Sequence, residues 1–108
     1  MSREARRLIL QSRLEEMLGS RNVYFQPPAT IQMQYPCIVY EYERQIIRHA
    51  NDLKYLKWDQ YTVIIIAPYT LLEVMDAIEE EPFCAFDREY VSEGLYHYVY
   101  SIRVSANA

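Results

Sequence analysis

The sequence predicts an α+β fold, with an antiparallel or mixed β-sheet of four to five strands and two helices on one face. Two segments repeat apolar residues at the spacing of an amphipathic helix, a continuous β-branched run indicates a buried strand, and the last segment alternates strongly. A chain of 108 residues has the size of one domain, so residues 1–108 are expected to form a single unit.

The first helix is expected over residues 3–18. Ser2 can cap its start, and Gly19 can end it in the left-handed conformation that glycine adopts readily. The apolar stripe consists of Leu10, Leu14, Met17 and Leu18. The opposite face is polar and is expected to be solvated; it carries Arg6, Gln11, Arg13 and Glu16.

Three strand signals follow. Residues 22–26 are expected to add a short edge strand, and residues 37–44 alternate between two faces. The run 63–67 is apolar throughout and rich in β-branched residues, which predicts a strand buried on both faces. The polar stretch 44–57 between these strands is expected to be the loop of a long hairpin, large enough to serve as a contact arm.

The second helix and two further strands complete the chain. Residues 70–73 (TLLE) form a capping box, and Pro82 ends the helix. The apolar stripe of this helix consists of Leu71, Val74, Met75 and Ile78. Residues 79–81 place three glutamates at the helix C-terminus, where they are expected to be solvated or paired with a partner. Strands are expected over residues 83–90 and 95–105.

The charge of the chain argues against two classes of partner. The formal net charge is −4, and the basic residues are scattered along the sequence. Non-specific binding to nucleic acids or anionic membranes needs clustered positive charge, so neither is expected. No apolar run is long enough to span a bilayer or to form a signal peptide. We therefore expect a cytoplasmic protein in which Cys37 and Cys84 are reduced thiols packed in the core.

Side chains that could perform catalysis are sparse. His49 and His97 lie far apart in sequence, and neither has neighbours with the spacing of metal ligands. Glu41 and Glu43 share a strand face, which would suit a divalent cation, but a solvated face is the simpler interpretation. The chain is therefore expected to be no enzyme and to hold no cofactor or metal. A small ferredoxin-like enzyme or toxin that uses His97 and Arg103 is the most distant alternative.

The sheet is expected to expose more apolar surface than two short helices can cover. Association of copies would bury the remainder. The segment 44–57 is longer than a hairpin turn requires, and such loops are commonly functional. Its basic residues are expected to contact an acidic neighbouring surface. The candidate interface residues are Arg44, Arg48, Lys54, Lys57, Trp58, Tyr96, Tyr98 and Tyr100.

Several short segments resemble a family of small phage proteins. They are residues 18–20 (LGS), 22–28 (NVYFQPP), 33–40 (MQYPCIVY), 61–63 (YTV) and 86–88 (FDR). From about residue 6 to residue 104, the chain is similar to the tail-terminator (tail-completion, gpU-like) proteins of long-tailed bacteriophages. The shared segments are structural and include no catalytic motif.

The resemblance implies a structural virion protein of the phage tail, assembled in the host cytoplasm as a homohexameric ring. Such a ring caps the tail tube, stops its polymerisation and joins the tail to the neck. Its partners would be copies of itself, the tail tube protein and the neck or head–tail connector protein, with DNA only passing through the lumen. Neck and head–tail connector (adaptor) proteins are of similar size, and that role is the nearer alternative.

Overall fold

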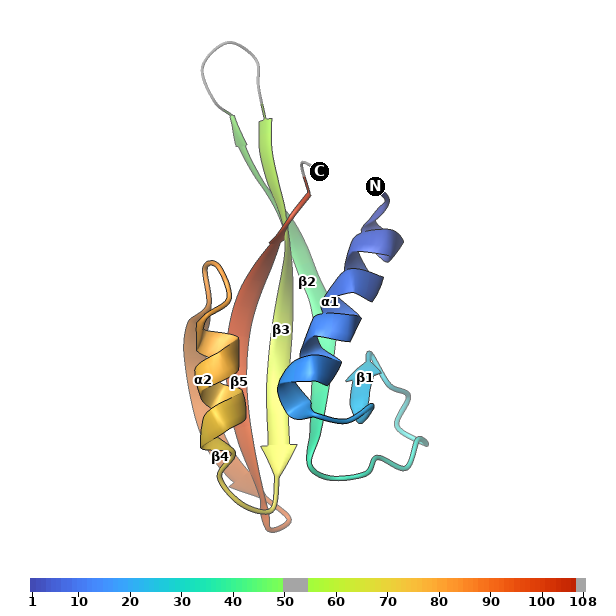
Figure 1. The fold of residues 1–108 in the computed structure, drawn as a ribbon, viewed down its shortest axis with the longest axis vertical. Helices are drawn as coiled ribbons and strands as arrows, with labels where there is room; N and C mark the ends of the chain where they lie inside the picture. The colour runs from blue at the N-terminus through green and yellow to red at the C-terminus, as the bar shows by residue number, and fades with distance from the viewer. Residues whose placement is uncertain (50–54, 107–108) are drawn as a thin grey trace.

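The computed structural model describes residues 1–49 and 55–106, shown in Figure 1. The elements are α1 (Arg3–Leu18), β1 (Val23–Phe25), β2 (Cys37–His49), β3 (Tyr55–Ala67), α2 (Leu72–Glu79), β4 (Ala85–Ser92) and β5 (Leu95–Ser105). The strands form one sheet in the order β1-β2-β3-β5-β4, with β1 parallel to β2 and the other neighbours antiparallel. Both helices lie on the same face, so the predicted α+β fold is confirmed. Neither helix is long and apolar enough to cross a membrane.

Helix α1 begins and ends where the sequence predicts. The Ser2 hydroxyl accepts a hydrogen bond from the Ala5 N–H at 3.1 Å, which caps the first turn. Gly19 ends the helix with a φ of 79°, a conformation that costs glycine little. Leu10 and Leu14 are fully buried. The predicted apolar stripe therefore faces the core.

Arg6 of α1 does not lie on a solvated face, and that prediction is wrong. Its side chain is buried, and Nε donates to Oδ2 of the fully buried Asp59 at 2.7 Å. Nη1 donates to the main-chain oxygen of Met1, also at 2.7 Å. Burial of the Asp59 carboxylate beneath the helix requires a counter-charge, and Arg6 supplies it.

Helix α2 begins without the predicted capping box. Its N-cap is Leu71, which makes no side-chain capping bond, while the Thr70 hydroxyl shares a hydrogen bond with the Tyr98 hydroxyl at 3.1 Å. A tertiary contact thus takes the threonine hydroxyl that the local motif would have used. Val74 and Ile78 are buried, so the predicted apolar stripe does face the core.

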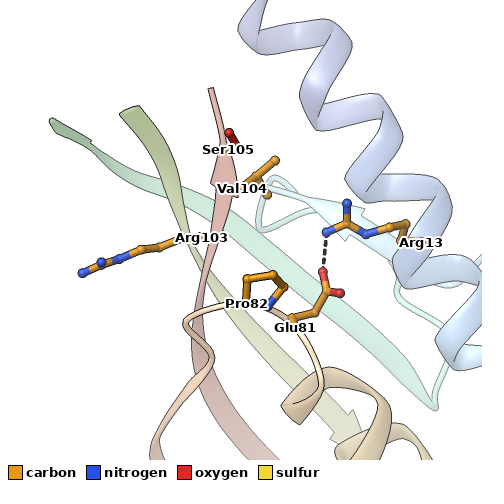
Figure 2. A pocket seen from close by; sticks show the side chains of 6 residues that line it. All are labelled: Arg13, Glu81, Pro82, Arg103, Val104 and Ser105. Carbon is orange, nitrogen blue, oxygen red and sulfur yellow. Dashed lines mark hydrogen bonds and ion pairs between the residues drawn. The ribbon is translucent and has the colours of Figure 1, made fainter. Parts of the chain in front are cut away.

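The acidic end of α2 is partly paired within the chain. The Tyr100 hydroxyl donates to Oε2 of Glu79 at 2.7 Å. The Glu81 carboxylate forms an ion pair with Arg13 of α1, which joins the two helices (Figure 2). Glu80 is exposed. Two of the three carboxylates that the sequence leaves to solvent or to a partner protein are therefore paired inside the subunit.

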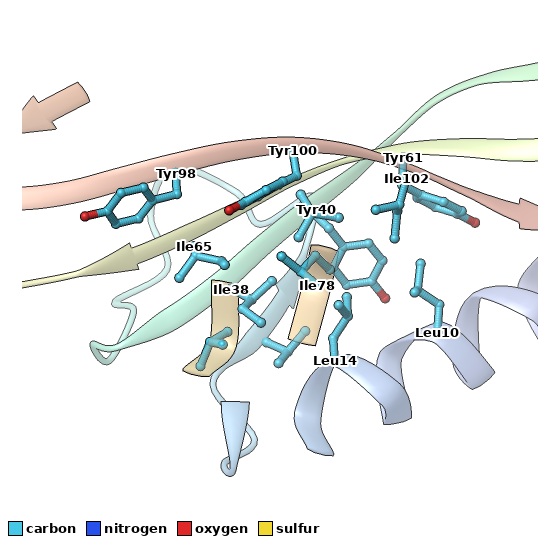
Figure 3. Packing of buried hydrophobic residues seen from close by; sticks show 13 residues of the cluster. Leu10, Leu14, Ile38, Tyr40, Tyr61, Ile65, Ile78, Tyr98, Tyr100 and Ile102 are labelled. Atoms are coloured by element: carbon cyan, nitrogen blue, oxygen red, sulfur yellow. The ribbon is translucent and has the colours of Figure 1, made fainter. Parts of the chain in front are cut away.

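The core lies between the helices and one face of the sheet (Figure 3). The strand register places aliphatic and tyrosine side chains in rows across β2, β3 and β5. One row consists of Ile38, Ile65 and Tyr98, and the next of Tyr40, Val63 and Tyr100; all six are buried. Leu10 and Leu14 of α1 and Ile78 of α2 close the core from the other side.

Neither helix covers the other face of the sheet, yet part of this face is also buried. Ile64 is half-buried there and Ile66 is buried, so the run 63–67 is buried on both faces as predicted. Cys37, opposite Ile66, is fully buried, whereas Cys84 is half-buried and packs against the core. Burial raises the pKa of both thiols to about 11, so both stay protonated at neutral pH.

Candidate functional site

Strands β2 and β3 extend beyond the rest of the sheet as a two-stranded ribbon (Figure 1, top). β1 pairs only with the first residues of β2, and the pairing of β5 with β3 ends at Trp58. The two strands continue to pair with each other as far as His49 and Tyr55. Among the described residues, 45–49 and 55–57 therefore have no third strand beside them. We call this ribbon the arm.

The arm corrects the prediction that residues 44–57 are a polar loop. Strand pairing runs through most of this segment, while residues 50–54, including Lys54, lie outside the described residues. The strand could not be recognised from the sequence pattern, because a bulge between Tyr42 and Arg44 shifts the alternation of inward and outward side chains by one residue. The apolar positions of the arm therefore do not follow the period set before the bulge.

One face of the arm is basic. The side chain of Asp59 in β3 points towards α1. Neighbouring residues of a strand point to opposite faces, so Trp58 and its partner in β2, Ile46, point away from α1. Arg44 and Arg48 lie two residues before and two residues after Ile46 in β2, so they share its face. Arg103 of β5 is directed to the same side, away from α1 (Figure 2). We call Arg44, Arg48, Trp58 and Arg103 the basic arm face.

The basic arm face is hollowed. Residues 44–48 and Arg103 line a hollow of about 340 Å³. The Arg103 guanidinium lies 5.2 Å from the ring centre of Phe83, whereas neither Arg44 nor Arg48 forms an ion pair with a described residue. Guanidinium groups without a carboxylate in their own subunit can bind one on a partner through two hydrogen bonds.

A second surface carries the opposite charge. Residues 72–94 hold eight of the fifteen acidic residues of the chain and one of its eleven basic residues. Within this segment, β4 is the outermost strand of the sheet, and every one of its residues is exposed. Leu72, Phe86 and Val91 add exposed apolar side chains. We call residues 72–94 the acidic side.

The predicted interface residues of the segment 44–58 that the structure describes lie on the arm or directly beside it. Arg44, Arg48 and Trp58 belong to the basic arm face, and Lys57 points to the opposite face of the ribbon. Lys54 lies outside the described residues. The structure therefore brings the first three together, and their role in an interface stays a prediction.

The predicted tyrosines of β5 divide between surface and core. Tyr96 is 40% exposed and lies opposite Val91 of β4. Tyr98 and Tyr100 are buried, and their hydroxyls hold the two ends of α2 through Thr70 and Glu79. Their rings therefore build the core and are not on the surface of the subunit, because α2 covers the alternating face that the sequence left open.

The candidate catalytic residues are not brought together. The ring of His97 stacks on Tyr90 with 4.5 Å between ring centres. Arg103 lies six residues further along β5, about 20 Å away, which is too far for both to act on one substrate atom. The bulge in β2 places Glu43 out of register with Glu41. The described residues include no group of three or more His, Cys, Asp or Glu that could hold a metal ion.

A buried polar cluster that was not predicted from the sequence lies beneath α1. Asp59 pairs with Arg6 through Oδ2, but its Oδ1 and the buried Tyr61 hydroxyl have no hydrogen-bond partner among the described residues. Burial, reinforced by the Asp59 charge, raises the pKa of Tyr61 to about 12. The period of β3 could have revealed the cluster, because Asp59 and Tyr61 share a face with Val63 and Ile65.

Comparisons with known proteins identify no family. No family model matches the chain, and no curated protein matches it. A chain of the solved structure "Virion of native gene transfer agent (GTA) particle" is similar, with a TM-score of 0.38 and 11% identity, over 86% of this chain and 84% of that chain. Values this low assign neither a family nor a role. The resemblance to phage tail terminators therefore stays a prediction from the sequence.

Proposed function

We propose that this chain is a structural subunit of a phage-like virion, a ring-forming tail terminator that caps the tail tube, stops its polymerisation and joins it to the neck. The arm carries the proposal, because a ribbon that leaves the body of the subunit can reach a neighbouring molecule. The resemblance of residues 6–104 to terminator proteins suggests the kind of assembly in which such subunits meet.

The proposed mechanism is steric. Copies of the chain form a closed homohexameric ring, and one face of this ring binds the last ring of the tail tube. The other face offers no surface to a further tube subunit, so growth stops and the neck protein can bind instead. No covalent bond is made or broken, so the mechanism needs no catalytic residue or cofactor.

The charge of the chain suits a ring through which DNA passes. Tight binding of phosphates needs clustered cations; the chain carries a net charge of −4, and its described cationic cluster, the basic arm face, is expected to contact protein. DNA in the lumen of the ring is therefore expected to move past without being held. We place the ring in the virion tail, after assembly in the host cytoplasm.

Deletion of the gene from the phage or prophage that encodes it tests this proposal. A particle without its terminator is expected to carry tails of abnormal and variable length, measured by negative-stain electron microscopy. The wild-type gene supplied in trans is expected to restore one tail length. Tails of normal length without heads would assign the neck or head–tail adaptor role instead. Normal, infectious particles in the deletion strain would contradict both roles.

A further inference from the structure

The arm receives little support from the rest of its own subunit, in which the Ala106 N–H donates to the Lys57 main-chain oxygen at 2.8 Å. A two-stranded ribbon is marginally stable in water unless further strands or a packed partner support it. Beyond Trp58 no third strand of the described chain lies beside it. Ile47 on one face and Leu56 on the other are 42% and 48% exposed. Contact with another molecule would cover these side chains and stabilise the ribbon.

The arm and the acidic side are complementary in charge. The described arm residues and their immediate flanks, 44–49 and 55–58, include Arg44, Arg48 and Lys57 but no acidic residue. On the acidic side, the exposed carboxylates that make no ion pair with a described residue are those of Glu73, Asp76, Glu79, Glu80, Glu89 and Glu93; among them Glu79 accepts a hydrogen bond from Tyr100. Opposite charge on two surfaces of one chain favours association between copies.

We infer that the arm of one copy docks on the acidic side of a second copy, with Arg44 and Arg48 opposite Asp87 and Glu89 of strand β4. β4 forms the outer edge of the sheet and all of its residues are exposed, so both carboxylates are accessible; a bulge between Phe86 and Arg88 sets Asp87 out of the regular alternation with Glu89. The ion pair of Asp87 with Arg88 joins two exposed side chains, so Asp87 can exchange this partner at little cost.

Apolar residues on both surfaces strengthen the match. Phe86 and Val91 of β4 are 52% and 62% exposed, and Leu56 is exposed on the same face of the arm as Arg48. Apolar contacts between charged pairs are typical of specific interfaces, in which burial supplies the affinity and charge selects the partner.

The contact joins two different surfaces and is therefore heterologous. At the base of the arm, Trp58 packs on Phe83 of its own acidic side, with ring centres 5.5 Å apart. The arm itself projects from one end of a subunit 52 Å long and points away from α2 and β4 (Figure 1), so it reaches β4 of a neighbour and not its own. Heterologous contacts between identical copies form a ring when the rotation between subunits closes. The inference thus deepens the proposed function, since it names the contact on which the proposed ring rests.

Charge exchange between the two surfaces tests the contact on the purified protein. The variants Arg44→Glu/Arg48→Glu and Asp87→Lys/Glu89→Lys are each expected to weaken self-association about tenfold or more in Kd, because like charges then face each other. An equimolar mixture of the two variants is expected to associate again. In the mixture, the reversed arm meets the reversed acidic side, and the unchanged arm meets the unchanged acidic side.

Sedimentation velocity over a concentration series measures each Kd. Wild-type association is expected to weaken in about 1 M salt, where the Debye length is about 3 Å. The variant Arg3→Glu/Arg21→Glu makes the same change in net charge as the arm variant, on exposed residues outside the arm, and it is expected to associate like the wild type. Circular dichroism of each variant checks the fold.

Three results would overturn the inference. One is a wild-type chain that stays monomeric at its highest soluble concentration in low salt. Another is a mixture of the two folded variants that stays monomeric. The third is an equal loss of association in the Arg3→Glu/Arg21→Glu control. The tail lengths of a deletion strain are measured independently of these three results. Failure of this contact and failure of the terminator role are therefore distinguishable.

Discussion

The same two strands, β2 and β3, build both the best covered and the least covered regions of this molecule. Between residues 37 and 42, β2 lies inside the sheet, next to β1 and β3, with helices over one face (Figure 1). In the arm, the same strand pairs with the same partner but has no third strand beside it among the described residues. Because the β2–β3 ladder continues through both regions, the cover that further strands and helices provide, and not this ladder, separates a core from a projection.

The largest expected effect is loss of the buried cation. Arg6→Met leaves the Asp59 carboxylate buried without its partner, and we expect the free energy of unfolding to fall by about 3–5 kcal/mol. The matched change Arg48→Met, in the arm, is expected to alter it by less than about 0.5 kcal/mol. Urea denaturation followed by circular dichroism measures both values. Similar losses in the two variants would remove the distinction between body and arm.

A comparison of two leucines sharpens the contrast without changing charge. Leu14→Ala removes a fully buried side chain and is expected to cost about 2–5 kcal/mol of unfolding free energy. Leu56→Ala removes an exposed side chain of the arm and is expected to cost less than about 0.5 kcal/mol in the isolated subunit. Urea midpoints at constant m-value report the difference. A cost at Leu56 near that at Leu14 would mean that the arm is packed against the body.

The body is also expected to lose stability at alkaline pH through its buried thiol. Burial raises the pKa of Cys37 from 9.0 to about 11, so the unfolded chain releases this proton first. The contribution of the buried, protonated thiol to the free energy of unfolding is complete below about pH 9 and is lost as the pH rises towards 11. At pH 11 the loss is about 2 kcal/mol relative to pH 8, and Cys37→Ala is expected to remove it. Unfolding curves of wild type and variant that stay parallel across this range would contradict the assignment.

The smallest free-energy differences are expected in amide exchange. Residues 45–49 are expected to exchange faster than residues 38–42 in the isolated protein, because an uncovered ribbon opens locally at low cost. In an assembly, residues 45–49 are expected to gain protection while residues 38–42 stay unchanged. Hydrogen exchange with mass spectrometry of free and assembled protein measures both segments. Equal exchange of residues 45–49 in the two states would mean that the arm contacts nothing.

Much of the fold could be predicted because its signals are local. Helix α1 follows from Ser2, Gly19 and a repeat of leucines, all within one segment. The strand at 63–67 follows from a β-branched run and its end at a proline. The strand portion of the arm could not be predicted, because the bulge before Arg44 breaks the alternation on which the interpretation depends.

The candidate surfaces show the same division. The basic residues of the arm and the acidic cluster around α2 and β4 are visible as charges in the sequence. Whether a tyrosine of β5 lies in the core or on the surface is not visible, since Tyr96, Tyr98 and Tyr100 share one face of the strand. The position of α2 decides it, because Tyr98 and Tyr100 bind the two ends of the helix and Tyr96 does not.

By itself, the sequence determined the type and order of the elements, the buried face of each helix and the charges available for contact. These properties depend on the spacing of residues within a segment, and that spacing is set by the period of a helix or strand. Only the tertiary structure decided that Arg6 is buried against Asp59 and that Thr70 binds Tyr98. It also decided that β2 and β3 extend beyond β1 and β5, the strands beside them. Each of these depends on a residue far away in the chain, and no local period records which distant side chain will be near.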